Sequence, residues 1–79
     1  MLLDQAQLKT AYLFEGLQEP ASAAQTQLLH MGLIPGSTIQ VLHRAPTGSP
    51  LQIRVGATTL SIRIELARSI LIREYPRGQ

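Results

Sequence analysis

The strongest constraint on the fold is a change of hydrophobic period near residue 38. From there on, apolar side chains stand at every second position, which is the repeat of a strand with one buried face. The alternation recurs in the runs STIQVLHR (37–44), LQIRV (51–55), LSIRI (60–64) and ILIRE (70–74). Half-buried strands that follow one another in this way predict a β meander.

The connections between these runs have the chemistry of turns. APTGSP (45–50) contains two prolines and a glycine, GATT (56–59) begins with glycine, and ELARS (65–69) has the length of about one helical turn. Because each connection joins neighbours in the sequence, we expect an antiparallel meander.

The residues before the meander predict one strand and one helix. TAYLFEGL (10–17) holds the only phenylalanine and has the aromatic character of a strand. Ser22 stands three residues before Gln25, the spacing of a capping box, and predicts the start of a helix of about nine residues. Gly32 then fits the left-handed position that ends such a helix.

One face of this helix is apolar, because Ala24, Leu28 and Met31 fall at i, i+4 and i+7, with Leu29 beside them. After Gly32 we expect Leu33 and Ile34 to fold back as hydrophobic contacts, and Pro35–Gly36 to form a turn. The residues assigned to structural turns are Gly32, Pro35, Gly36, Pro46, Gly48 and Pro50.

The length allows one domain, residues 1–79. Five short strands are too few for a two-sheet sandwich of ordinary size, whereas a strongly bent sheet can close and remove its edges. We therefore expect an all-β fold with short helices, namely a small SH3-like β-barrel of about five antiparallel strands with one helix inserted after the first strand.

Composition restricts the function and the compartment. The chain has no cysteine and hence no disulfide or thiolate metal site, which fits the reducing cytoplasm. The N-terminus lacks the pattern of a secretory signal, and no apolar run approaches the ~20 residues of a membrane span, so we expect a soluble protein. The net charge is +2 and the arginines are scattered, which argues against a nucleic-acid partner.

Four short motifs follow one another along the chain. They are L-x-x-x-G-L-x-P-G-S at Leu28–Ser37, A-P-x-G-x-P at Ala45–Pro50, L-x-I-R at Leu60–Arg63, and the alanine-containing turn at Glu65–Ala67 before a strand ending in ILI. In these motifs the sequence resembles the FeoA family of small bacterial proteins of ferrous-iron uptake. The resemblance covers roughly residues 10–74.

The resemblance implies an SH3-like barrel and a cytoplasmic, non-enzymatic accessory protein without a cofactor. The implied partner is FeoB, a membrane Fe(II) transporter with a cytosolic GTPase domain, whose cytosolic region the protein would bind to support or regulate transport. We expect a monomer that reaches the membrane only through this partner.

Five residues are candidates for contact with the partner. Neighbouring helix positions diverge by about 100°, so Leu28, Leu29 and Met31 cannot all face a small core, and one of them can remain available to a partner. Packing of all three against the barrel is the competing interpretation. Arg44 and Arg54 are candidates for an arginine supplied to a GTPase, against the ordinary interpretation as solubilising surface residues.

Metal binding and catalysis have weaker support in the sequence. His30 and His43 are the only histidines, and no spaced set of ligands accompanies them. Ser37 and Ser49 have no evident base and orienting acid. We predict neither a metal site nor an enzyme.

Other binding functions remain as alternatives. The main one is an SH3-like interaction or regulatory module related to the C-terminal domain of iron-dependent repressors, without a role in transport. A reader of proline-rich peptides is disfavoured, because such grooves are lined by aromatic residues and this chain has no Trp, one Phe and two Tyr.

Overall fold

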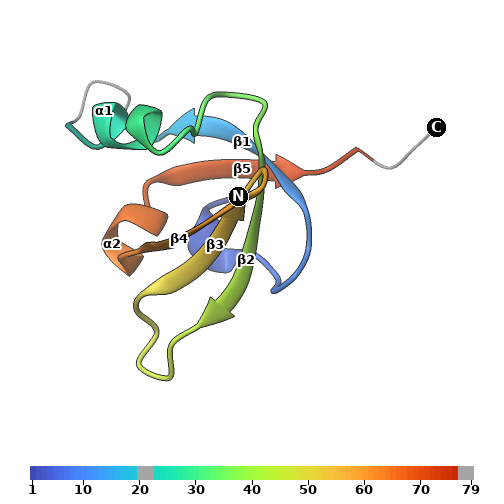
Figure 1. Ribbon diagram of the computed structural model, residues 1–79, viewed down its shortest axis with the longest axis vertical. Helices are drawn as coiled ribbons and strands as arrows, with labels where there is room; N and C mark the ends of the chain where they lie inside the picture. Colours follow the sequence, from blue (N-terminus) through green and yellow to red (C-terminus); the bar gives the residue numbers. More distant parts are fainter. Residues whose placement is uncertain (20–22, 77–79) are drawn as a thin grey trace.

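The computed structural model describes residues 1–19 and 23–76 (Figure 1). A short 3₁₀ helix η1 precedes five strands and two α-helices. Their bounds, in chain order, are η1 (Leu3–Gln5), β1 (Tyr12–Leu17), α1 (Ala23–His30), β2 (Thr38–Arg44), β3 (Leu51–Val55), β4 (Thr58–Ile62), α2 (Ile64–Ala67) and β5 (Ile70–Glu74).

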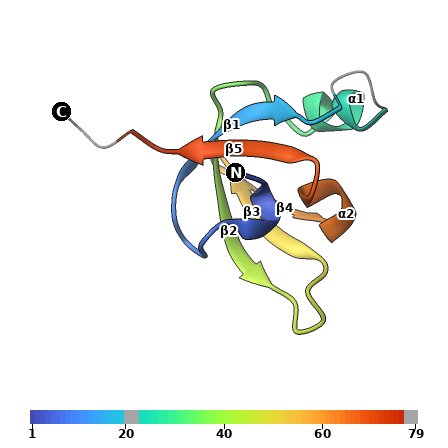
Figure 2. The same cartoon turned by 180° about the vertical axis from the view of Figure 1, so that it is seen from behind.

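The five strands form one bent antiparallel sheet in the order β4-β3-β2-β1-β5 (Figures 1 and 2). The helix α1 follows β1 and lies at one end of the sheet. The predicted SH3-like class, the number of strands and the inserted helix are confirmed.

The closure of the barrel differs in part from the prediction. A closed cylinder pairs its first strand with its last, and β5 does pair with β1. Among the described residues no ladder joins β4 to β5, so the predicted closure of the cylinder is wrong and the sheet keeps two edges. The physical reason is α2, whose Ala67 is fully buried and which carries the chain across the open side.

The boundaries of β4 also differ from the prediction. The strand begins at Thr58 and ends at Ile62, whereas we predicted 60–64. It begins early because Gly56 has a φ of +58° and makes a two-residue turn that pairs Val55 with Thr58. It ends early because the Ile64 N–H donates to Ser49 Oγ at 3.1 Å, and α2 begins there.

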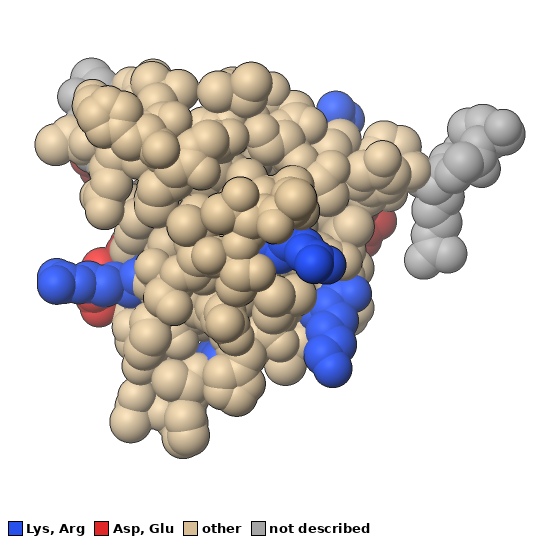
Figure 3. All heavy atoms as spheres, in the orientation of Figure 1, with Lys and Arg blue, Asp and Glu red and all other residues tan. Residues whose placement is uncertain are grey.

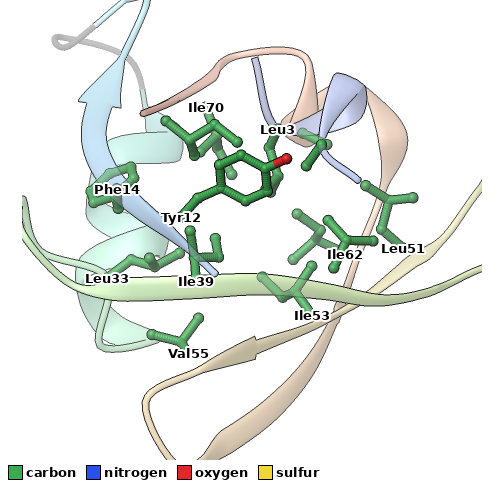
Figure 4. Close-up of a cluster of buried hydrophobic side chains, with 14 of the residues drawn as sticks. Leu3, Tyr12, Phe14, Leu33, Ile39, Leu51, Ile53, Val55, Ile62 and Ile70 are labelled. Atoms are coloured by element: carbon green, nitrogen blue, oxygen red, sulfur yellow. The ribbon is translucent and has the colours of Figure 1, made fainter. Parts of the chain in front are cut away.

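The core lies inside the bent sheet, where side chains from all strands, η1 and the turn after α1 point toward one another (Figure 4). Burial alternates along β3, as predicted. Among the described residues no charged or polar residue is buried. The buried residues are Leu3, Ala6, Tyr12, Phe14, Leu17, Leu28, Leu33, Ile39, Val41, Leu51, Ile53, Val55, Ile62, Ala67, Ile70 and Ile72.

The end of α1 follows the sequence prediction closely. Gly32 has a φ of +86°, its N–H donates to the Leu29 carbonyl at 3.0 Å, and the Leu33 N–H donates to the Leu28 carbonyl at 2.9 Å. This is a Schellman motif, in which the side chains of Leu28 and Leu33 are both buried. Ser22, the predicted capping residue, lies outside the described residues.

The residues after Gly32 follow the prediction only in part. Ile34 is 55% exposed, so the prediction that it folds back against the core is wrong. The cause is the following turn, in which Gly36 has a φ of +94° and the Ser37 N–H donates to the Ile34 carbonyl at 2.9 Å. Pro35–Gly36 therefore forms the predicted turn, and Ile34 stands on its outer side.

The second predicted loop, residues 45–50, is also a turn. The Gly48 N–H donates to the Ala45 carbonyl at 2.7 Å, and Gly48 has a φ of +93°. The Ala45 N–H donates in turn to the Pro50 carbonyl at 3.2 Å, which closes the loop between β2 and β3.

The N-terminal residues cover one edge of the sheet, which the sequence analysis did not predict. Leu2 forms an isolated antiparallel bridge with Leu71, and the Ile72 N–H donates to the Met1 carbonyl at 2.8 Å. The side of β5 that does not face β1 is thus partly occupied. No helix in the described part of the chain is long and apolar enough to cross a membrane.

Candidate docking site

A groove of about 270 Å³ lies between α1 and the paired strands β1 and β5. Apart from one glutamate and one glutamine, the residues that line it are apolar or glycine. They are Phe14, Glu15, Gly16, Leu17, Gln25, Leu28, Leu29, Leu33, Pro35 and Leu71.

Two local features build the groove. The pairing of β1 with β5 shifts its register between Phe14 and Gly16, and Gly16 has a φ of +143°, which a residue with a side chain rarely adopts. On the opposite wall, the Schellman motif holds Leu28 and Leu33 together at the end of α1. The irregular strand and the abrupt helix end therefore face each other across the groove.

The floor of the groove is buried and its rim is exposed. Phe14, Leu28 and Leu33 are each at most 4% exposed, whereas Leu29 on the rim is 50% exposed. A half-exposed leucine beside a preformed apolar floor makes this groove the candidate for contact with another protein.

Charge is confined to the rim. Glu15 lines the groove, and its Oε2 lies 3.7 Å from Arg73 Nε in an exposed ion pair. The sequence of α1 has no charged residue, and the surface over α1 is largely uncharged in Figure 3. Apart from the Glu15 carboxylate at the rim, the groove offers mainly apolar contact area.

The structure brings together only two of the five predicted contact residues. Leu28 and Leu29 line the groove, the first at its floor and the second at its rim. Met31 is half-buried and lines a separate hollow beside β4. Arg54 is exposed on β3 and does not line the groove.

Arg44 has a structural contact that the sequence did not suggest. Its two terminal guanidinium nitrogens donate to the carbonyl oxygens of Asp4 and Ala6, at 3.0 and 3.2 Å. The side chain therefore holds the N-terminal segment against β2, and both of its terminal nitrogens already donate hydrogen bonds within the protein.

Several residues of the groove were not among the predicted contacts. Gly16, Leu17, Pro35 and Leu71 come from three different parts of the chain, so no local pattern connects them. Gly16 did carry a signal, because an isolated glycine inside a strand indicates a bulge or an open space beside the backbone.

The two histidines do not converge. His30 is exposed at the end of α1, and His43 is exposed on β2. No group of three or more His, Cys, Asp or Glu side chains that could hold a metal ion occurs among residues 1–19 and 23–76.

Comparisons with solved structures define the class of the fold. The iron(II) transport protein A of Clostridium thermocellum aligns with a TM-score of 0.86 and 23% identity, over 94% of this chain and 45% of that protein. The chain thus spans less than half the length of that relative. FeoA of Stenotrophomonas maltophilia in complex with zinc, described as a prokaryotic SH3 domain protein, aligns with a TM-score of 0.77 and 27% identity, over 91% and 88% of the two chains.

A different kind of protein shares the fold. A manganese-dependent transcriptional repressor aligns with a TM-score of 0.83 and 13% identity, over 95% of this chain and 41% of the repressor. At this identity the likeness concerns the fold alone. No curated protein sequence matches the chain.

These alignments and the bent five-stranded sheet define an SH3-like domain protein. The sequence matches the family model described as the FeoA domain over residues 1–74. The chain belongs to the FeoA family.

Proposed function

We propose that the protein is a cytoplasmic accessory protein of Fe(II) uptake, which binds the cytosolic region of a FeoB-type transporter and supports or regulates transport. Membership of the FeoA family supports the role in ferrous-iron transport. The related protein of S. maltophilia has been suggested to act as a ferrous iron transport activating factor. The protein acts by binding and not by catalysis.

The observation that carries this proposal is the apolar groove beside Leu29. In a small domain, an exposed leucine that borders a buried apolar floor gains more from contact with a partner than an isolated surface leucine does. We assign Leu29 and Leu71 as rim contacts and Leu28 as part of the floor. Arg54 and Met31 lie outside this groove and would be reached only by a larger partner surface.

Regulation follows if the partner binds through the groove in one of its states more tightly than in another. A ligand shifts a conformational equilibrium only through such a difference in affinity. The GTPase domain of the transporter has nucleotide-dependent states, and binding that depends on the nucleotide would couple the accessory protein to the transport cycle.

The proposal is tested by titrating the protein against the cytosolic region of its own transporter, with GDP and with a GTP analogue, by calorimetry. We expect binding in at least one state and a loss of tenfold or more with Leu29→Gln. Leu8→Gln is the matched control, because Leu8 is 48% exposed but lies outside the groove. Absence of binding in both states would overturn the proposal, and equal losses for the two variants would exclude the groove.

The alternative is a regulatory module like the domain that metal-dependent repressors carry. The similarity to the manganese-dependent repressor supports the shared fold, but it covers 41% of that protein. A module of this kind has no role in transport and would not bind the cytosolic region of the transporter, so the same titration distinguishes the two functions.

A further inference from the structure

The two edges of the open sheet differ in how they are protected. Met1 and Leu2 cover the free side of β5. The strand β4 is paired only with β3 in the described part of the chain, and Thr58, Thr59 and Ser61 are exposed. An open edge is a template for another strand unless charge, proline or a bulge blocks it, and the sequence TTLSI of β4 has none of these.

The pairing of β4 with β3 fixes which backbone groups point outward. The two-residue turn makes Val55 and Thr58 a hydrogen-bonded pair, so Leu60 and Ile62 also bond to β3. Thr59 and Ser61 then direct their N–H and C=O groups away from β3. The described backbone hydrogen bonds outside the ladders include no partner for these groups.

We propose that β4 pairs with β4 of a second copy of this chain, antiparallel about a two-fold axis at Leu60. In this register Thr59 lies opposite Ser61 of the second copy, and Ser61 opposite Thr59. Each of these pairs exchanges both of its outward backbone hydrogen bonds. A two-fold axis is the commonest symmetry of soluble dimers, and an axis at the centre of β4 lets both copies use the same edge.

The surroundings of β4 match this register. Arg63 would lie opposite Ala57 of the second copy, so no two like charges meet along the strand. An open hollow lies beside the end of β4, lined among others by Met31, Ser61, Arg63 and Glu65. The turn that would enter this hollow from the second copy consists of the two smallest residue types, Gly56 and Ala57.

The choice of a second copy as occupant rests on the absence of like charges in this register and on the open hollow beside β4, which the small residues of the turn can enter. A single pair of five-residue strands buries little area, so the dimer is weak and forms at high protein concentration. The groove between α1 and β1 lies outside the proposed contact. The inference is therefore independent of the proposed function, and transporter binding and self-association can be measured separately.

The first test measures the mass of the protein by analytical ultracentrifugation over a range from micromolar to millimolar concentration. We expect the average mass to rise toward the dimer, and Ser61→Lys to abolish the rise, because lysine on an edge opposes strand addition. Gln52→Lys is the matched control, since Gln52 lies opposite Ser61 on β3, is exposed and carries the same change of charge away from the edge. A monomer at every concentration would overturn the proposal.

A second test examines the register and needs no high affinity. The chain has no cysteine. In the proposed dimer the Cα atoms of the two Leu60 residues are about 4.5 Å apart, within the range of a disulfide. Oxidation of Leu60→Cys should therefore give a covalent dimer, whereas Thr58→Cys, two residues away on the same strand, should give much less. Equal yields for the two variants would reject the register, and the edge would then be open to a strand of another protein.

Discussion

Strand β3 and helix α1 are attached to the core in different ways. β3 buries Leu51, Ile53 and Val55 and is paired on both sides. Of the residues of α1 whose side chains are described, Leu28 alone is buried, and the Schellman turn with Leu33 is the second attachment. Stability therefore resides mainly in the sheet, and the helix is a lightly attached element whose other described side chains are exposed.

Truncation of a single buried side chain should reduce stability most in the sheet. Ile53→Ala leaves a cavity in the centre of the core, because Ile53 is fully buried and its neighbours can relax only in part. We expect the free energy of unfolding to fall by about 2–5 kcal/mol in urea titrations. Arg54→Ala, on the exposed side of the same strand, should change it by less than about 0.5 kcal/mol. Similar values for the two variants would contradict the described burial.

Truncation of the helix contact should have a smaller and more local effect. Leu28→Ala removes the buried side chain of α1, but the helix can shift to fill part of the space, so we expect a loss nearer to about 2 kcal/mol. Hydrogen exchange distinguishes this from global unfolding. The amides of α1 should lose protection while those of β3 keep most of theirs. Equal loss in both elements would mean that the helix and the sheet form one cooperative unit.

The sequence allowed a good prediction of much that depends on neighbouring residues, although the start of β4 at the Gly56 turn and the exposure of Ile34 were missed. The alternation in LQIRV gave β3 with its bounds, and Gly32 gave the end of the helix, because period and left-handed φ are local properties. The gap between β4 and β5 was not predictable in this way. The register of β5 against β1 joins residues far apart in the chain, and the turn at 64–67 by itself does not determine whether β5 also reaches β4.

The candidate site was predicted less well for the same reason. Leu28 and Leu29 belong to one helical run and were found together, but Leu71 reaches the groove only through the pairing of β5 with β1. Arg44 shows the reverse case. Its position on a strand suggested an available cation, whereas the fold brings two backbone carbonyls of the N-terminal segment to its guanidinium group.

Substitution of Gly32, in the turn that ends α1, should have an intermediate effect on stability. Gly32 has a φ of +86°, so Gly32→Ala places a side chain in a conformation that costs about 1 kcal/mol, although nothing lies within 4 Å of the added carbon. Gly32→Asn should cost less, because asparagine adopts this region more readily. Thermal unfolding of the two variants checks the prediction. If the Gly32→Ala variant were as stable as the unchanged protein, the Schellman motif would not be what holds the end of α1.

The smallest effect on stability is expected at the residue with the largest expected effect on binding. Leu29 neighbours Leu28, but its side chain is 50% exposed, so Leu29→Gln should change the free energy of unfolding by less than about 0.5 kcal/mol. The same substitution at Leu28 would place an amide in the core and should unfold a large fraction of the protein. The contrast between two adjacent leucines, measured by urea titration, tests whether α1 divides its surface between a folding contact and a docking contact. A large loss of stability with Leu29→Gln would instead make both residues part of the core, and any accompanying loss of binding would then reflect the fold and not the groove.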